Sequence, residues 1–201
     1  LDLLKTQFHS IGFNSFARHL EELLRQADQN DWSHLQFVHQ MITHELSARQ
    51  LTRITYNLKR AGFPVRKHLE EFDFSFQTTI SKKQIHRLLD FTFVHNRENI
   101  VFIGPAGVGK THLATAIAIK AIDAGFKVLR LSALELVEAL DLAESRGTLR
   151  EKITSLLKFD ILYIDELGYL PVNKQSAYNF FQLINALYEY RSLLLTTNKN
   201  F

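Results

Sequence analysis

The stretch 99–113 reads NIVFIGPAGVGKTHL, and it constrains the fold of this chain more than any other. Its apolar run Ile100–Ile103 predicts a buried strand, and a helical pattern resumes at Lys110. The segment between them fits G-x-x-x-x-G-K-[ST], whose glycines let backbone N–H groups curl around a polyphosphate. We expect Lys110 to reach the β- and γ-phosphates and Thr111 to ligate Mg²⁺, with the positive end of the new helix facing the anion. The motif predicts a nucleotide site formed by these residues: Gly104, Pro105, Ala106, Gly107, Val108, Gly109, Lys110, Thr111 and His112.

From residue 99 onward, predicted strands alternate with predicted helices. The strands are expected at 100–103, 127–131, 160–164 and 192–197. The helices are expected at 110–124, from a Ser132 cap to about 147, at 149–158, and from about 173 to 190. Strands separated by helices of this length predict an α/β fold with a parallel, doubly wound sheet. The loops at the carboxyl ends of the strands should then form the site.

Two further strand ends carry polar residues suited to phosphate chemistry. The third predicted strand is followed directly by Asp165 and Glu166. Asp165 would hold Mg²⁺ directly or through water, and Glu166 would polarise water for attack on the γ-phosphate. A kinase or a small GTPase does not need this second carboxylate, so the pair favours hydrolysis over transfer. Asn198 ends the fourth strand; such an Asn is commonly a turn former, but its order after the Asp-Glu strand favours a role beside the γ-phosphate.

Residues 1–68 are predicted to form a small, all-helical N-terminal domain. Apolar residues at helical spacing predict one helix at about 15–29 and a second from Trp32 to about Ala61. Thirty residues is long for a globular helix, so a break near Ser47 is the alternative. Gly62 and Pro64 then end the helical pattern.

Residues 69–80 are predicted to be an extended linker, because 70–77 alternate aromatic and polar residues. Phe72, Phe74 and Phe76 would pack on the surface of the following domain, or one of them would line the pocket for the base. Ser81 and Gln84 form a capping box for a helix that should reach about Val94.

A basic run without acidic residues extends from 49 to 67. Arg49, Arg53, Asn57 and Arg60 recur at i, i+4, i+8 and i+11, so they share one helix face. That face is either simply solvated or contacts phosphates, and the lack of acidic residues favours contact with phosphates. The candidate DNA-binding residues are Arg49, Arg53, Lys59 and Arg60.

The composition excludes several classes of protein. The chain contains no cysteine, which excludes disulfides, thiol nucleophiles and cysteine-ligated zinc. No apolar run approaches eighteen residues, so no membrane span is predicted. His34, His39 and His44 recur every five residues, which places them on different sides of a helix and argues against a shared metal.

The strings at 104–114 (GPAGVGKTHLA), 164–171 (IDELGYLP) and 197–199 (TNK) resemble the AAA+ ATPases of the DnaA/DnaC clade. Within that clade they are most similar to IstB, the helper ATPase of a family of bacterial insertion sequences. The segments 60–64 and 72–74 also resemble IstB, so the similarity covers about 49–201. By this resemblance Lys110 and Thr111 belong to Walker A, Asp165 and Glu166 to Walker B, and Asn198 is sensor 1.

The resemblance implies an AAA+ ATPase domain at 81–201 that binds and hydrolyses ATP with Mg²⁺. It also implies ATP-dependent self-assembly, binding of double-stranded DNA, and assistance to a transposase in the bacterial cytoplasm. The family's arginine finger lies downstream of sensor 1, so we expect the chain to be truncated at its C-terminus and assign no finger. The alternatives are a DnaC-like loader of a replicative helicase, which the string at 167–171 disfavours, and a small-molecule kinase, for which no lid is recognisable.

Overall fold

The computed structural model describes residues 1–75, 79–168 and 173–199. Phe76 of the predicted linker and residues 169–171 of the IDELGYLP string lie outside the described residues. The chain divides into two compact units, Leu1–Thr55 and Tyr56–Phe201. The finer division into a domain at 1–68, a linker at 69–80 and a domain at 81–201 stays a prediction. Within the described ranges, no helix combines the length and the apolar character needed to cross a membrane.

The first unit is helical, as predicted. It contains α1 (Asp2–Ser10), α2 (Asn14–Gln29) and most of α3 (His34–Arg60). Phe16, Leu20 and Leu23 form its buried core, because their spacing places them on one face of α2. Phe8 of α1 meets Phe16 edge to face, with ring centroids 4.8 Å apart. The helix α3 is continuous, so the chain does not break near Ser47.

The buried carboxylate of Glu45 in α3 caps the N-terminus of α2. The residue that precedes α2, Phe13, provides no side-chain cap. Instead, Glu45 Oε2 accepts the backbone N–H groups of Ser15 and Phe16, each at 2.9 Å. Glu45 Oε1 accepts Arg49 Nε at 2.9 Å, and only 3% of the Glu45 side chain is exposed. Glu45 therefore satisfies two of the N–H groups that the first turn of a helix leaves free.

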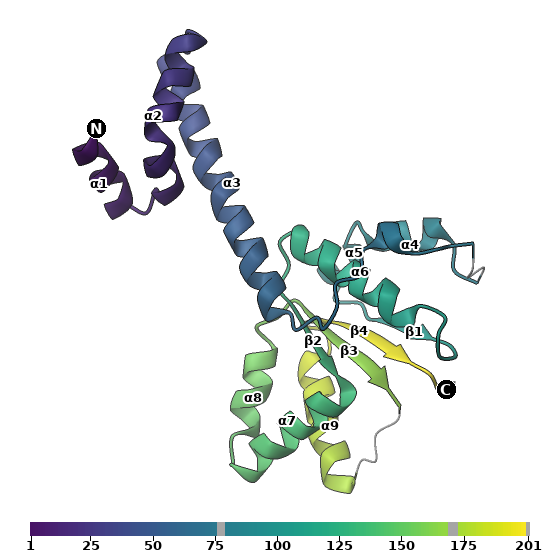
Figure 1. Ribbon diagram of the computed structural model, residues 1–201. Helices are drawn as coiled ribbons and strands as arrows, with labels where there is room; N and C mark the ends of the chain where they lie inside the picture. The colour runs from purple at the N-terminus through teal and green to yellow at the C-terminus, as the bar shows by residue number, and fades with distance from the viewer. Residues whose placement is uncertain (76–78, 169–172, 200–201) are drawn as a thin grey trace. The chain divides into compact units, whose positions relative to one another are not determined.

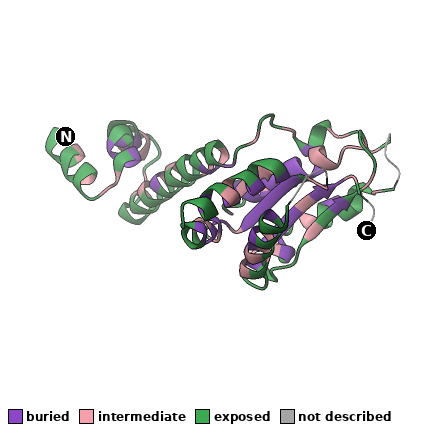
Figure 2. Cartoon of the chain, turned by 90° about the horizontal axis from the view of Figure 1, so that it is seen from below, coloured by how far each residue is buried: buried purple, intermediate pink, exposed green. Residues whose placement is uncertain are grey.

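Within its described residues, the second unit contains a four-stranded parallel sheet, as predicted. Its strands are β1 (Ile100–Ile103), β2 (Val128–Ser132), β3 (Ile161–Leu167) and β4 (Ser192–Thr197). Their order in the sheet is β1-β4-β3-β2, with every neighbouring pair parallel. The two central strands are buried over almost their whole length, whereas the helices expose their outer sides (Figure 2).

Helices cover both faces of the sheet (Figure 1). The helix α6 (Lys110–Asp123) lies on one face, and α7 (Ala133–Ser145), α8 (Leu149–Leu156) and α9 (Lys174–Leu187) lie on the other. Leu162 and Ile164 of β3 belong to the core formed with α7, α8 and α9. The residues that alternate with them, Tyr163 and Asp165, therefore point to the face of α6. This alternation places a carboxylate beside the start of α6.

The segment before β1 differs from its prediction. Ser81 and Gln84 form the predicted capping box, but the helix α4 (Lys82–Leu88) ends six residues before Val94. A separate short helix, α5 (Thr92–His95), follows. Phe91 lies between them with φ at +57°, a left-handed conformation that no helix continues through. Phe91 is buried and contacts Phe126 with ring centroids 5.4 Å apart, so tertiary packing of its ring opposes the helical pattern.

Candidate functional site

The phosphate-binding pattern forms a loop between β1 and α6, as predicted. Gly107 and Gly109 have φ values of +82° and +87°, which side chains rarely adopt, and Gly109 directly precedes α6. A cavity of about 390 Å³ opens at this loop and is lined by Ala106, Gly107, Gly109, Lys110, Thr111 and His112. The Lys110 ammonium donates to the Pro105 carbonyl at 2.6 Å, which places a positive charge beside the start of the helix.

The two predicted metal ligands meet, although 54 positions separate them in the sequence. Thr111 Oγ1 donates to Asp165 Oδ1 at 3.0 Å. The same oxygen of Asp165 accepts Thr196 Oγ1 at 2.6 Å and the Tyr163 hydroxyl at 3.1 Å. Burial alone would raise the pKa of Asp165, but the hydrogen bonds from Thr196, Arg130 and Thr111 outweigh it and hold that pKa below its usual range. Burial raises the pKa of Tyr163, so its hydroxyl stays protonated and can donate.

These residues fit a magnesium ion. Mg²⁺ prefers hard oxygen ligands and is commonly held by one or two protein oxygens together with phosphate oxygens and waters. The Thr111 hydroxyl and the ionised Asp165 carboxylate supply such oxygens at the mouth of the loop. Thr111 and Asp165 are therefore the residues that would hold the ion.

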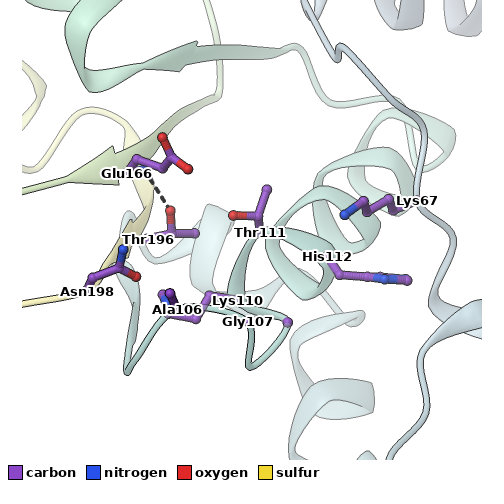
Figure 3. A pocket seen from close by; sticks show the side chains of 10 residues that line it. Lys67, Ala106, Gly107, Lys110, Thr111, His112, Glu166, Thr196 and Asn198 are labelled. Carbon is purple, nitrogen blue, oxygen red and sulfur yellow. Dashed lines mark hydrogen bonds between the residues drawn. The ribbon is translucent and has the colours of Figure 1, made fainter.

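Glu166 reaches the cavity through an irregularity in β3. The pairing of β3 with β4 shifts register between Ile164 and Leu167, and Glu166 has φ at +61°. The Glu166 N–H donates to Thr196 Oγ1 at 2.9 Å, which fixes the turn. Bulges of this kind re-aim side chains beside active sites. The Glu166 side chain is exposed and lines the cavity together with Thr196 and Asn198, which face Thr111 and Lys110 (Figure 3).

The segment after α3 packs against the loop on the side opposite the strand ends. It includes the short 3₁₀ helix η1 (Leu69–Glu71). The Phe72 ring lies so close to Gly109 that a Cβ there would come within 2.5 Å of Phe72 Cε2. The His112 ring meets Phe72 at 5.3 Å between centroids, and His112 Nε2 lies 2.8 Å from the His68 carbonyl. Phe72 therefore packs on the surface of the second unit, which is one of the two expected fates of the linker aromatics.

Sequence reasoning missed three residues around this cavity. Lys67 lines it and points its ammonium toward Thr111 (Figure 3). Thr196 bridges Asp165 and Glu166, and Arg130 of β2 places its Nη2 2.9 Å from Asp165 Oδ2. For Arg130 a signal exists, because it is a charged residue within the otherwise apolar run VLRL. Lys67 ends the basic run at 49–67, and nothing in that run indicates a place at the cavity.

The predicted DNA-binding residues differ in their surroundings. Arg49 donates to Glu45 and, at 2.6 Å, to the Gly12 carbonyl, so it stabilises the first unit. Arg60 lies over the Tyr56 and Phe159 rings. Arg53 and Lys59 are exposed, and neither pairs with a carboxylate among the described residues. Their contact with DNA stays a prediction.

Comparison with known proteins agrees with this architecture. The model of the family "IstB-like ATP binding protein" matches residues 6–201. The chain is 39% identical to the "Insertion sequence IS21 putative ATP-binding protein" of Pseudomonas aeruginosa, over 98% of this chain and 75% of that protein. It is 37% identical to the "Insertion sequence IS232 putative ATP-binding protein" of Bacillus thuringiensis subsp. berliner, over 98% of this chain and 79% of that protein.

Solved structures with the same fold include AMPPCP-bound DnaA from Aquifex aeolicus, with a TM-score of 0.57 and 25% identity. That match covers 68% of this chain and 43% of DnaA, so the chain spans less than half of that protein. The DnaC helicase loader matches with a TM-score of 0.50 and 25% identity, over 61% of this chain and 73% of the loader. The second unit is thus an AAA+ fold of the DnaA/DnaC kind. Since the family model extends over nearly the whole sequence, the chain belongs to the family of IstB-like ATP-binding proteins.

Proposed function

We propose that this protein is a Mg²⁺-dependent ATPase that assembles on double-stranded DNA and assists a transposase in selecting target DNA. The observation that supports hydrolysis most directly is the meeting of Thr111 and Asp165 at 3.0 Å beside a cavity that Glu166 also lines. A site that only bound nucleotide would not need a second carboxylate held in a strained backbone conformation beside the metal ligands.

Each residue has a distinct role in this proposal. Lys110 and the N–H groups of the loop bind the phosphates, and Thr111 and Asp165 hold the metal ion, which neutralises phosphate charge when bound. Glu166 accepts a proton from the attacking water, and Asn198 orients that water by hydrogen bonding. Thr196 fixes Asp165 and Glu166 relative to each other, because its hydroxyl donates to the Asp165 carboxylate and accepts the Glu166 backbone N–H.

DNA and a transposase are proposed as partners on other grounds. The relatives are described as insertion-sequence proteins, and transposition requires both a transposase and DNA. Arg53 and Lys59 provide exposed positive charge for phosphate contacts. Self-assembly with ATP is proposed because the resemblance to IstB implies it.

A helicase loader is the second candidate, supported by the structural similarity to DnaC. The family match and the relatives at 39% and 37% identity favour the transposition helper. ATP turnover separates the two, because a transposition helper should be stimulated by double-stranded DNA and a loader by single-stranded DNA with its helicase. Stimulation by a small phosphoryl acceptor alone would refute both and would indicate a kinase.

A further inference from the structure

Arg130 is a largely buried guanidinium that the proposed roles do not use. It lies in β2, where Leu129 and Leu131 on either side pack into the core with α7, α8 and α9. Only 15% of its side chain is exposed. A buried charge is costly unless it is paired, so its partners indicate why it is there. Its Nη2 donates to Asp165 Oδ2 at 2.9 Å, and its Nη1 lies 3.4 Å from Glu135 Oε2.

The two oxygens of Asp165 receive different donors. Oδ1 accepts the hydroxyls of Thr111, Thr196 and Tyr163, whereas Oδ2 accepts Arg130. The side chain of Asp165 is 3% exposed, so it has little water to replace a lost partner. Donors on both oxygens fix the rotation of the carboxylate, and Oδ1 is the oxygen that meets the hydroxyl of Thr111.

The backbone of Arg130 is itself held from both sides. On one side β2 pairs with β3, with Arg130 opposite Tyr163. On the other side the Arg130 N–H donates to the Ala61 carbonyl at 2.7 Å. The guanidinium therefore projects from a rigid position, which is what an anchor for a neighbouring ligand requires.

We propose that Arg130 is a positioning residue for the divalent cation: by holding Asp165 Oδ2, it keeps Oδ1 turned toward Thr111 and the metal position. This inference rests on the proposed function, because it assumes that Thr111 and Asp165 hold the ion. Removing a partner that orients a metal ligand typically costs about 10- to 100-fold in metal affinity. A contrary effect exists, because a nearby guanidinium repels a cation and competes for the carboxylate. The two effects predict opposite signs.

Metal binding can be measured without turnover by using Mn²⁺ in place of Mg²⁺. The full chain is mixed with AMPPCP and titrated with Mn²⁺, and electron paramagnetic resonance quantifies the free ion. We expect Arg130→Met to weaken nucleotide-dependent Mn²⁺ binding about 10- to 100-fold, while binding of the nucleotide in EDTA stays unchanged. Binding of Mn²⁺ by Arg130→Met as tight as in the wild type, or tighter, would overturn the proposal.

Glu135→Gln is the matched control. Glu135 is the other partner of Arg130, and Gln retains the capping box with Ser132 at the start of α7. Because Asp165 still accepts the Arg130 guanidinium in this variant, we expect Mn²⁺ affinity within about twofold of the wild type. A loss as large as that in Arg130→Met would show that the start of α7, and not the contact with Asp165, determines the affinity, and this would also overturn the proposal.

Arg130→Lys provides the test if Arg130→Met does not fold by circular dichroism. Lysine keeps the charge but lacks the fork that reaches both Asp165 and Glu135, so Mn²⁺ affinity should still decrease. Unchanged affinity in a folded Arg130→Lys would refute the positioning role. A wild-type protein that binds no Mn²⁺ with AMPPCP would refute the ATP site of the proposed function itself. Normal wild-type binding with no effect at Arg130 would refute this inference alone.

Discussion

Replacing Glu45 with Ala should strongly destabilise the first unit. The change leaves the N–H groups of Ser15 and Phe16, each 2.9 Å from the carboxylate, without their acceptor in a buried place. A buried donor without a partner costs about 1–3 kcal/mol, so the two together should cost roughly 2–4 kcal/mol after partial hydration of the space left by the side chain. The ion pair with Arg49 adds little, because 53% of that side chain is exposed.

The loss can be measured in the full chain because Trp32 is its only tryptophan. Trp32 lies in the first unit, so urea unfolding followed by tryptophan fluorescence reports on that unit. Glu45→Gln should cost only about 1 kcal/mol, since the amide oxygen still accepts both N–H groups but without a charge. Glu22→Ala is the control of the same kind: this exposed residue of α2 pairs with Arg25, and its removal should leave the urea midpoint unchanged. Equal midpoints for Glu45→Ala and Glu22→Ala would refute the capping role of Glu45.

The same carboxylate predicts a dependence on pH. Burial would raise the pKa of Glu45, but hydrogen bonds from Phe16, Arg49 and Ser15 outweigh it, so the pKa lies below its ordinary value of 4.5. A group whose pKa is lower in the folded state stabilises the fold fully above its unfolded pKa and loses that contribution as pH falls through the folded pKa. The difference in unfolding free energy between wild type and Glu45→Gln should therefore be constant above about pH 5 and should shrink below pH 4.5. A difference that does not change down to pH 3 would contradict this interpretation.

Three further predictions concern the second unit and the basic face. Glu166→Gln should leave ATP binding intact and lower turnover by about 10²–10⁴, with Glu151→Gln on the exposed side of α8 as the control; retained turnover would reject Glu166 as the base. Gly109→Ala should abolish nucleotide binding, because a Cβ at this position would lie 2.5 Å from the Phe72 ring and would force the phosphate-binding loop out of its conformation. Gly147→Ala, with φ at +68° but open space around it, should cost stability only, and equal nucleotide affinities would refute the steric argument. Changing both Arg53 and Lys59 to Ala should lower DNA affinity on every sequence and reduce the salt slope by about 2, whereas changing Lys82 and Lys83 together should not. An unchanged slope would show that Arg53 and Lys59 do not contact DNA.

Much of the second unit could be predicted because its signals are local. The bounds of β1 and β4 agree with the prediction, since each strand contains an apolar run and is followed directly by residues that form turns. The capping boxes at Ser81 and Ser132 are also present, because two residues three positions apart suffice to specify each. The order β1-β4-β3-β2 is not local in this sense. It depends on which strand pairs with which, and the periodicity of single segments contains no such information.

The break at Phe91 shows where local patterns fail. Residues 82–94 are compatible with one helix. No glycine or proline in this segment indicates the left-handed conformation that Phe91 adopts. Its ring is buried against Phe126, a residue more than thirty positions later. The free energy of burying an aromatic ring exceeds the cost of one unfavourable backbone conformation. Such competition can be recognised only when both partners have been located in the fold.

The same reasoning separates the residues of the basic face, which the sequence treats as equivalent. The helical spacing of arginines shows that several positive charges lie on one helix, but it does not show which of these side chains already bind other residues of the chain. Arg49 is bound to Glu45 and Gly12, so an Arg49→Ala variant would lose stability in the first unit whether or not Arg49 contacts DNA. In a variant that replaces Arg49 together with other basic residues of α3, a lower DNA affinity could come either from unfolding of the first unit or from the loss of DNA contacts. The exposed residues Arg53 and Lys59 are therefore the better test, since replacing them changes the charge of α3 without removing a contact that holds the described fold together.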